Sequence, residues 1–446
     1  AAAAVEESAA GSEEEEAAED ICSALEENAL QDLMLASLHV ADPKLAKSVR
    51  IVLTPLHQAK KSPDVDQLLH RMYGPILWRG LAAANPLVRL NATPVLADTF
   101  PLRDPGEGED RTEAVVSKTA DALVALLRDP EPRVRVAASN AAGRIMVSFW
   151  DVLQTADIRR LLNEIITKHS SDASSAAVRA EAVATTSLLL EAEHSRAVLR
   201  PLLPSLGNLI HDKVEKVRVA VVRMLLKIKK IRGLKYYHVV PVEHLLARLQ
   251  AEGEVLDNPT SVVATELTGL MLNSYFPQGE GVTSADQIKR TLTFLTNNDG
   301  AASIFYQNIA YHLSISSVAK LAAMLLKCLS AAIDSDVKES AAASSKAKKK
   351  KKSKKRGRDE GSADEDEEVG GGDKTLNASN TKLMAAIAET ICCLWESIGP
   401  SLGEAENEEC NNFLTEAFSG SILTDALSHF EQKHEEAVDN EDKAQQ

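Results

Sequence analysis

The stretch from residue 128 to residue 135 reads RDPEPRVR, and altered copies of it recur along the first half of the chain. Each copy joins a short polar turn to a Val-Arg dipeptide, and the valines of the five copies are separated by 39, 46, 44 and 39 residues. The other copies are ADPKLAKSVR (41–50), ANPLVR (84–89), SDASSAAVR (171–179) and HDKVEKVR (211–218). An internal period of this size indicates a repeat protein in which one small unit is copied along the chain.

Apolar residues flank each turn at the spacing of a helix face. The positions eleven and seven before the repeated valine are apolar in the clearest copies, and the position four after it is small or apolar in all five. This pattern predicts one amphipathic helix before each turn and one after it, and the Asp of the turn is placed to cap the second helix. The positions are Leu77, Leu123, Leu206, Leu81, Leu127, Ile210, Leu53, Ala92, Ala138, Ala182 and Val221.

Helix pairs with this period are typical of HEAT and armadillo repeats, and the D-P-x-x-x-V-R turn favours HEAT. Aromatic residues make up only 4% of the chain, and no sustained strand alternation is present. The predicted fold is therefore an all-α HEAT-repeat α-solenoid, a superhelical array of helix pairs with disordered linkers. A sixth unit is expected at 256–272, where Val262 follows Val217 by 45 residues. A further helical pair is expected at about 284–333.

Charge is distributed unevenly along the chain, whose formal net charge is -15. Residues 1–20 carry eight acids and no base, residues 346–358 carry ten bases, and residues 359–368 carry seven acids. Residues 21–345 are nearly balanced, so the acidity does not describe the folded surface. Segments that lack large apolar residues cannot bury enough surface to fold. We expect an acidic disordered segment at 1–20, the solenoid at 21–335, a disordered Lys-rich then acidic linker at 336–382, C-terminal helices at 383–430 and a charged tail at 431–446.

Several classes of protein are disfavoured. The chain has no uninterrupted apolar run of 18 residues, so no membrane segment is expected. Its start lacks an initiator Met, a basic region and an apolar region, which is not typical of a signal peptide and suggests a fragment. The five cysteines form no C-x-x-C pair, so we expect buried free thiols in place of a metal site or disulfides. Nucleotide, metal and nucleophile motifs are lacking as well, so no enzyme activity and no cofactor are expected.

The repeated arginine permits two interpretations. Five arginines at one position of the repeat could form a cationic row along a groove. Alternatively, each could pair with the Asp of its own or a neighbouring turn, because a guanidinium matches a carboxylate in geometry. The acids recur together with the bases, and this favours the structural role. These arginines are Arg50, Arg89, Arg135, Arg179 and Arg218.

The segment 213–235 is different, because it holds nine bases and one acid. Between its two apolar strips, Arg223, Lys227 and Lys230 align at i, i+4 and i+7 of a helix. Three aligned cations without an acid repel one another, which points to an anionic partner. We interpret them as candidate contacts to the phosphates of duplex DNA, and no Asn, Gln or aromatic cluster indicates base readout, so binding would not depend on sequence. A solvated face of a packed helix remains the alternative.

The tract AKKKKKSKKRGR (347–358) is a candidate nuclear localisation signal. Runs of Lys and Arg also bind nucleic acid without specificity, so the two roles remain open. The residues concerned are Lys348, Lys349, Lys350, Lys351, Lys352, Lys354, Lys355 and Arg356.

Five segments resemble, in order and spacing, the central HEAT-repeat region of a known family, the G-two non-SMC subunits of the condensin II complex. The resemblance covers roughly residues 65–335. The segments are MYGPILWRGLAAANPLVRLNATPVLADTFPLRDP (72–105), LLRDPEPRVRVAAS (126–139), SSAAVRAEAV (174–183), HDKVEKVRVAVVRMLLKIKKIRGLKYYHVVPVEHLLARL (211–249) and SIFYQNIAYHLSISSVAKLAAMLLKCL (303–329).

The resemblance implies a non-catalytic subunit of the condensin II complex. Such a subunit binds the kleisin chain and, through it, the SMC ATPase subunits, and it helps to hold duplex DNA during mitotic chromosome assembly and condensation. The implied location is the nucleus and the chromosomes. The alternative function is a HEAT-repeat protein-interaction scaffold of the nuclear-transport or phosphatase-scaffold type.

Overall fold

The computed structural model describes residues 23–254, 261–353, 381–418, 424–425, 427–432 and 435, and within these ranges it leaves out the side chains of 27, 109 and 335–353. Every regular element in these ranges is a helix, and none of the described residues is in a strand. The all-α class is therefore confirmed. The chain divides into two compact units, Ala1–Pro241 and Val242–Gln446, and the division falls inside the stretch that the sequence predicts as one solenoid.

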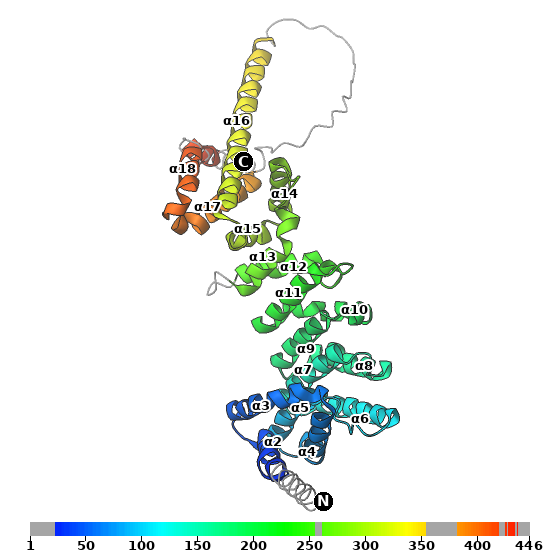
Figure 1. Ribbon diagram of the computed structural model, residues 1–446. Coiled ribbons are helices and arrows are strands. Elements are labelled where there is room, and N and C mark those ends of the chain that lie inside the picture. The colour runs from blue at the N-terminus through cyan, green and yellow to red at the C-terminus, as the bar shows by residue number, and fades with distance from the viewer. Residues whose placement is uncertain are drawn as a thin grey trace, which may run out of the picture. The chain divides into compact units, whose positions relative to one another are not determined.

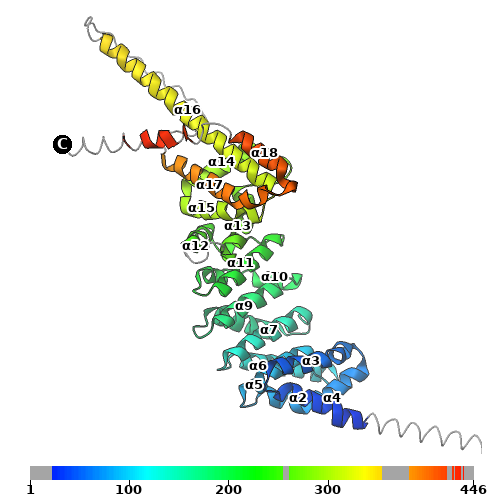
Figure 2. The same cartoon turned by 90° about the vertical axis from the view of Figure 1, so that its left-hand side faces the viewer.

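Unit 1 consists of helices joined by short turns (Figures 1 and 2). Its α-helices are α2 (Gln31–His39), α3 (Pro43–Gln58), α4 (Pro63–Leu81), α5 (Pro86–Asp98), α6 (Glu109–Leu127), α7 (Pro132–Ser148), α8 (Thr155–Leu162), α9 (Ala176–Leu189), α10 (Glu193–Leu199) and α11 (Glu215–Lys230). Short π or 3-10 segments complete it: η1 (Leu25–Leu30), η2 (Ala59–Lys61), η3 (Asn163–Lys168), η4 (His169–Ser171), η5 (Leu203–His211) and η6 (Tyr236–His238).

The second helices of the repeats form one continuous layer of unit 1. Helix α5 packs on α7, α7 on α9, and α9 on α11, as Figure 1 shows along the centre of the unit. The first helices, among them α6 and α8, form a neighbouring layer. Each repeat therefore contacts mainly the one before it and the one after it, as in other solenoids.

Small residues let the second helices approach closely. Gly143 of α7 faces α9, and a Cβ at this position would lie 2.7 Å from Thr185 Cγ2. Ala138 and Ala182 are buried in the same layer. The eleven positions that the sequence marks as apolar are all buried, so the predicted helix faces are confirmed: Leu53, Leu77, Leu81, Ala92, Leu123, Leu127, Ala138, Ala182, Leu206, Ile210 and Val221.

The first helix pair departs from this regular stack. Helix α2 packs on α3, α4 and α5, whereas α3 makes fewer contacts with α5 than the later second helices make with one another. Figure 1 shows α3 to the side of the layer that α5, α7, α9 and α11 form. One face of α3 is therefore not covered by the next repeat.

Unit 2 follows a different plan. Its helices are α12 (Val242–Gly253), α13 (Val262–Tyr275), α14 (Ser284–Asn297), α15 (Asp299–Asn308), η7 (Ile309–Tyr311), α16 (Ile315–Ser353), α17 (Thr381–Leu402), η8 (Ala405–Asn407) and α18 (Glu408–Ala417). Helix α17 packs on α15 and α16, so the C-terminal helices join this unit. Helix α16 continues to Ser353, past the end that the sequence predicts at residue 335. Residues 354–380 of the expected linker, as well as the segments 1–20 and 436–446, lie outside the described residues, and the last two residues of that linker begin α17.

Aromatic rings fill the core of unit 2. Tyr275 stacks on Phe294 with ring centroids 3.7 Å apart, and Phe305 meets both rings edge-on. The helices of unit 1 pack closely through small residues, whereas those of unit 2 pack through large rings. Edge-on and stacked aromatic pairs bury much area with defined geometry.

Two segments of unit 2, Ile315–Asp334 and Thr381–Leu402, are long and apolar enough by length and composition to cross a membrane. The core helices of soluble proteins pass the same test. Half of the first segment is buried inside the fold, and α16 and α17 pack against each other. This finding is therefore weak evidence for a membrane contact.

Candidate functional site

The polar turns between the helices of unit 1 use their Asp, Asn and Glu side chains in two ways. Asp42 and Asn85 cap α3 and α5 directly, because their side chains accept hydrogen bonds from the Lys44 and Leu87 amides at 2.8 and 3.0 Å. Asp129 lies further from its helix and closes the turn by accepting from the Glu131 amide, while Glu131 caps α7. The predicted capping role of the turn Asp thus applies to α3, and the later turns differ because their acids also receive an arginine.

Three arginines each reach the Asp of the next turn along the chain. Arg89 donates from Nε and Nη2 to the two carboxylate oxygens of Asp129 at 2.6 and 2.9 Å. Arg179 binds Asp212 in the same two-pronged way at 2.6 and 3.0 Å. Arg135 donates from Nη2 to Asp172 at 2.7 Å. We call these three ion pairs, Arg89–Asp129, Arg135–Asp172 and Arg179–Asp212, the turn row.

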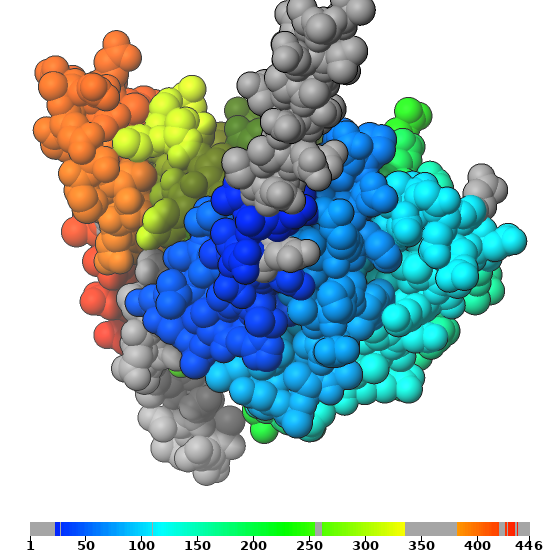
Figure 3. Space-filling model, turned by 60° about the horizontal axis from the view of Figure 1, so that its bottom comes forward, coloured from blue at the N-terminus to red at the C-terminus, as the bar shows by residue number. Residues whose placement is uncertain are grey.

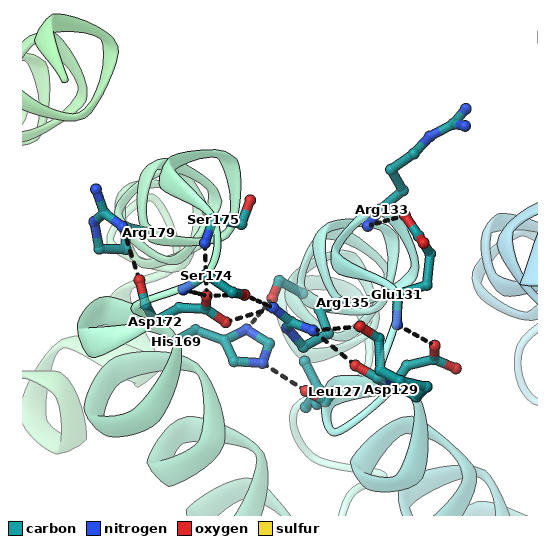
Figure 4. A network of polar contacts seen from close by, with 12 residues as sticks. Leu127, Asp129, Glu131, Arg133, Arg135, His169, Asp172, Ser174, Ser175 and Arg179 are labelled. Atoms are coloured by element: carbon teal, nitrogen blue, oxygen red, sulfur yellow. Dashed lines mark hydrogen bonds and ion pairs between the residues drawn. The ribbon is translucent and has the colours of Figure 1, made fainter.

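Each arginine of the turn row also holds the turn that precedes its own helix, as Figure 4 shows for Arg135 and Arg179. Arg135 Nη1 donates to the Asp129 and Pro130 carbonyls at 2.8 and 3.2 Å, and Arg89 and Arg179 make equivalent contacts with their own turns. One guanidinium therefore joins its own turn to the next one. Because several of its donors point to protein acceptors, little of the group is left to bind a ligand.

The turn row is shielded from water and electrostatically matched. Its arginine side chains are 11 to 17% exposed and its carboxylates 6 to 12%. Burial alone would raise the pKa of Asp129, but the hydrogen bonds from Arg89 and the Glu131 amide outweigh it and hold that pKa below its usual range. The pKa values of Asp172 and Asp212 are lowered by the same balance.

The first and last of the five repeated arginines have other contacts. Asn85 stands where the next turn would supply an Asp to Arg50, and Arg50 lies instead 3.6 Å from Asp98 at the far end of α5. Arg218 donates to the Asp212 and Lys213 carbonyls of its own turn at 2.9 and 3.2 Å.

The cationic stripe of α11 is not uniform. Arg223 and Lys230 are exposed, whereas Lys227 is half-buried. Lys227 Nζ donates to Glu191 Oε1 at 2.7 Å and to the Ser187 carbonyl at 3.0 Å, so it ties α11 to the end of α9. The premise that the bases of this helix lack acidic partners is therefore wrong for Lys227. The sequence does not reveal the pair because its members lie 36 residues apart.

A cluster of rings follows the basic end of α11. Tyr237 lies edge-on to Tyr236 and to His238, with centroids 5.5 and 4.9 Å apart, and it is exposed. Arg232 and Lys235 are exposed in the same turn. The sequence pattern indicates no aromatic cluster for base readout, and the consecutive YYH after the lysines is the signal in the sequence that points to these rings.

A buried serine and histidine lie in contact beneath the turn row, as Figure 4 shows for the histidine. His169 Nε2 lies 2.7 Å from the Leu127 carbonyl and must donate to it, so Nδ1 accepts from the Ser139 hydroxyl at 2.8 Å. Burial lowers the pKa of His169. Ser139 is completely buried, so no substrate can reach it, and the pair serves packing and not nucleophilic chemistry.

The remaining predicted sites have these outcomes. The backbone of α16 includes Lys348 to Lys352, whose side chains are not described, and Lys354, Lys355 and Arg356 lie outside the described residues. Within the described ranges, no cluster of three or more His, Cys, Asp or Glu could hold a metal ion. The expectation of buried thiols is wrong for the four described cysteines, because Cys392 is exposed and Cys328, Cys393 and Cys410 are half-buried. Cys22 lies outside the described residues.

Comparison with known proteins identifies relatives along nearly the whole chain. A family model described as "Condensin II non structural maintenance of chromosomes subunit" matches residues 14–104. The G2 subunit of the condensin-2 complex of Danio rerio is 34% identical over 92% of this chain and 33% of its own length. The proteins of that name from Xenopus laevis and Homo sapiens are 33 and 32% identical over 94 and 92% of this chain. The chain spans about a third of the length of these relatives.

Among solved structures, an engineered protein matches 91% of this chain and 99% of its own chain, with 14% identity and a TM-score of 0.32. A likeness this low carries no argument about function.

Proposed function

We propose that the chain is a member of the family of condensin II non-SMC subunits, which it resembles over about a third of the relatives' length, and that it is a non-catalytic scaffold of the condensin II complex. It binds the kleisin subunit and, through it, the SMC ATPase subunits. Its work is mechanical: it holds these chains and duplex DNA together in mitotic chromosome assembly and condensation.

The observation that carries this proposal is the identity of 31 to 34% with four condensin-2 proteins of one name along more than nine tenths of the chain. The stacked helices of unit 1 support it, since a solenoid presents a long surface to extended partners.

Affinity purification of the tagged chain from mitotic cells, followed by mass spectrometry, tests the proposal. We expect the kleisin and SMC subunits of condensin II as the main specific partners. Recovery of transport cargo or phosphatase subunits in their place would favour the alternative scaffold function and contradict the proposal.

We also propose that duplex DNA lies along the basic end of α11. The 27 residues from 216 to 242 contain eight Lys or Arg and no acid. Arg223 and Lys230 are exposed there, while Lys227 contributes less because Glu191 already neutralises much of its charge. We call Arg223 and Lys230, together with Arg232 and Lys235 of the following turn, the α11 surface. Phosphate contacts of this kind are independent of base sequence.

A charge-reversal pair tests the DNA contact. Arg223→Glu with Lys230→Glu should lower duplex affinity and reduce the slope of log K against log salt by about 1.8, since each phosphate contact contributes about 0.9. The matched control is Arg133→Glu with Arg159→Glu, which changes the net charge equally at two exposed positions on α7 and α8. Equal losses in both variants would show an effect of net charge alone and would contradict the site.

The lysine tract supports a proposal for nuclear location. Replacement of Lys348–Lys352, Lys354, Lys355 and Arg356 by alanine should move a fluorescent fusion of the chain from the nucleus to the cytoplasm. Unchanged nuclear import in dividing and resting cells would assign the tract to another role. Limited proteolysis tests the proposed division of the chain, since cleavage should concentrate within 1–20, 354–380 and 431–446.

A further inference from the structure

Helix α3 presents an apolar strip to solvent at the N-terminal side of unit 1. Leu45, Ile51 and Val52 are 52, 59 and 65% exposed. Figure 3 shows the surface that the N-terminal helices, in blue, form here. Leu45 and Val52 lie on one face of the helix, and Ile51 lies about a third of a turn away from them. Monomeric proteins often expose single apolar residues, whereas a group of exposed apolar residues on one helix indicates a contact site.

The strip follows the geometry of a helix. Leu45 and Val52 are seven residues apart, so they lie on one side, and exposed Pro55 continues that side by nearly one turn. Ala46 and Leu53 lie about 100° further round the helix and are buried. One face of α3 thus fixes the helix to the unit, and the other face is open.

No other repeat places a large apolar residue at this point. Val52 stands three residues after the repeated valine, where the other four copies carry small or polar residues that are partly covered by their neighbours. These residues are Asn91, Ala137, Glu181 and Ala220. The strip is therefore a property of α3 and not of the repeat.

Cations flank the strip. Residues 43–63 contain five bases and no acid. Two of the five are committed within the fold, since Arg50 pairs with Asp98 and Lys60 with Asp66. The other three, Lys44, Lys47 and Lys61, are exposed and form no ion pair among the described residues. An open apolar strip with a positive border complements a ligand that has an apolar centre and a negative border.

We propose that this face of α3 docks an acidic amphipathic segment of a partner protein. Apolar side chains of the segment, spaced as on one face of a helix, cover Leu45 and Val52, and its carboxylates meet Lys44, Lys47 and Lys61. A peptide helix laid along an apolar strip is a common recognition mode. Duplex DNA fits less well, because its phosphates offer nothing to the apolar centre. The proposal does not depend on the condensin assignment.

The probe is a fluorescein-labelled 18-residue peptide with Leu at positions i, i+3, i+7 and i+10 and Glu at most of the others. Its binding to the chain is measured by fluorescence anisotropy at low and moderate salt. Leu45→Glu with Val52→Glu should weaken binding by about tenfold or more, as loss of a central apolar anchor does. Lys44→Glu with Lys47→Glu should weaken it chiefly at low salt, because exposed charges are screened.

Matched controls separate the α3 face from general effects. Val152→Glu with Val198→Glu places the same two new charges at exposed apolar positions outside α3 and should leave binding unchanged. A peptide with Lys in place of Glu should bind at least tenfold more weakly. Circular dichroism should show unchanged helix content in all variants, because the substituted positions are exposed.

Other outcomes would overturn the proposal. Equal binding by the Leu45/Val52 variant would remove the site. Displacement of the probe by duplex DNA would assign the face to nucleic acid. A dimer in sedimentation that Leu45→Glu with Val52→Glu abolishes would assign it to a second copy of the chain. Stronger probe binding after deletion of residues 1–22 would assign it to the acidic N-terminal segment.

Discussion

The turn row and the α11 surface use the same kinds of cation in opposite ways. In the turn row, each arginine lies between its own turn and a carboxylate of the next one, largely shielded from water. On the α11 surface, Arg223 and Lys230 are exposed in a segment that has no acid. Residue type alone does not separate a structural cation from one that binds a partner, whereas the degree of shielding from water does.

Lowering the pH should reduce the stability of the chain more than any single substitution does, because it acts on all three ion pairs of the turn row at once. Asp129, Asp172 and Asp212 have lowered pKa values in the folded chain. Below about pH 4 the unfolded chain binds protons that the folded chain does not, so stability falls as the pH drops through the lowered values. Urea unfolding between pH 3 and pH 7 measures this loss.

Two buried histidines should make the stability of the chain begin to fall at a higher pH than the carboxylates alone would. Burial lowers the pKa of both His57 and His169 from the usual 6.5. The unfolded chain therefore takes up protons first, and stability begins to fall below about pH 6.5. His169→Gln should reduce the slope in this range and leave the slope below pH 4 unchanged. A profile that is flat from pH 7 to pH 4 would contradict both assignments.

Arg135→Ala should give the largest effect of any single substitution in the turn row. It removes hydrogen bonds to Asp172, to Ser174 and to two carbonyls, and it leaves a shielded carboxylate without its partner. We expect a loss of about 2–3 kcal/mol in the free energy of unfolding. Arg133→Ala, two residues away and exposed, is the control and should cost less than about 0.5 kcal/mol. Chemical denaturation of both variants measures the two losses in the free energy of unfolding.

Arg179→Lys should have an intermediate effect. The lysine keeps the charge but cannot form the two parallel hydrogen bonds to Asp212, so a loss of about 1 kcal/mol is expected. Thermal unfolding measures it. An unchanged melting temperature would show that charge, and not the fork geometry, holds the two turns together.

Lys227→Ala should have the smallest effect on stability, about 0.2–1 kcal/mol, because the pair with Glu191 is partly exposed. Its effect on DNA affinity should also be smaller than that of Lys230→Ala, since Lys227 is already engaged. Anisotropy titrations with one labelled duplex compare the two variants. A larger loss for Lys227 would place the DNA on the α9 side of α11.

The sequence predicted the repeat because the period and the apolar positions are local features that every copy repeats. It could not supply the partners of individual cations, which depend on which turns stack. Arg50 lacks an acid in the following turn, where Asn85 stands, and the contact with Asp98 follows only from the three-dimensional arrangement. The exposed strip of α3 has the same origin, because its composition resembles a packed helix until the neighbouring repeat is seen to leave it open.

The sequence repeat that organises unit 1 does not continue into unit 2. Val263 replaces the arginine at the sixth copy, so the register that organised unit 1 gives no further guidance. The aromatic cluster of Tyr275, Phe294 and Phe305 brings together residues from three helices with no repeated spacing. Its existence could be inferred only from packing.

The most direct test of the central claim measures duplex affinity and unfolding free energy on the same two variants. We predict that Arg135→Ala lowers stability and leaves DNA affinity unchanged, while Arg223→Glu with Lys230→Glu lowers DNA affinity in a chain that stays folded. Loss of DNA affinity in Arg135→Ala under conditions where it is folded, or intact DNA binding in the Arg223/Lys230 variant, would contradict the division between structural and partner-binding cations.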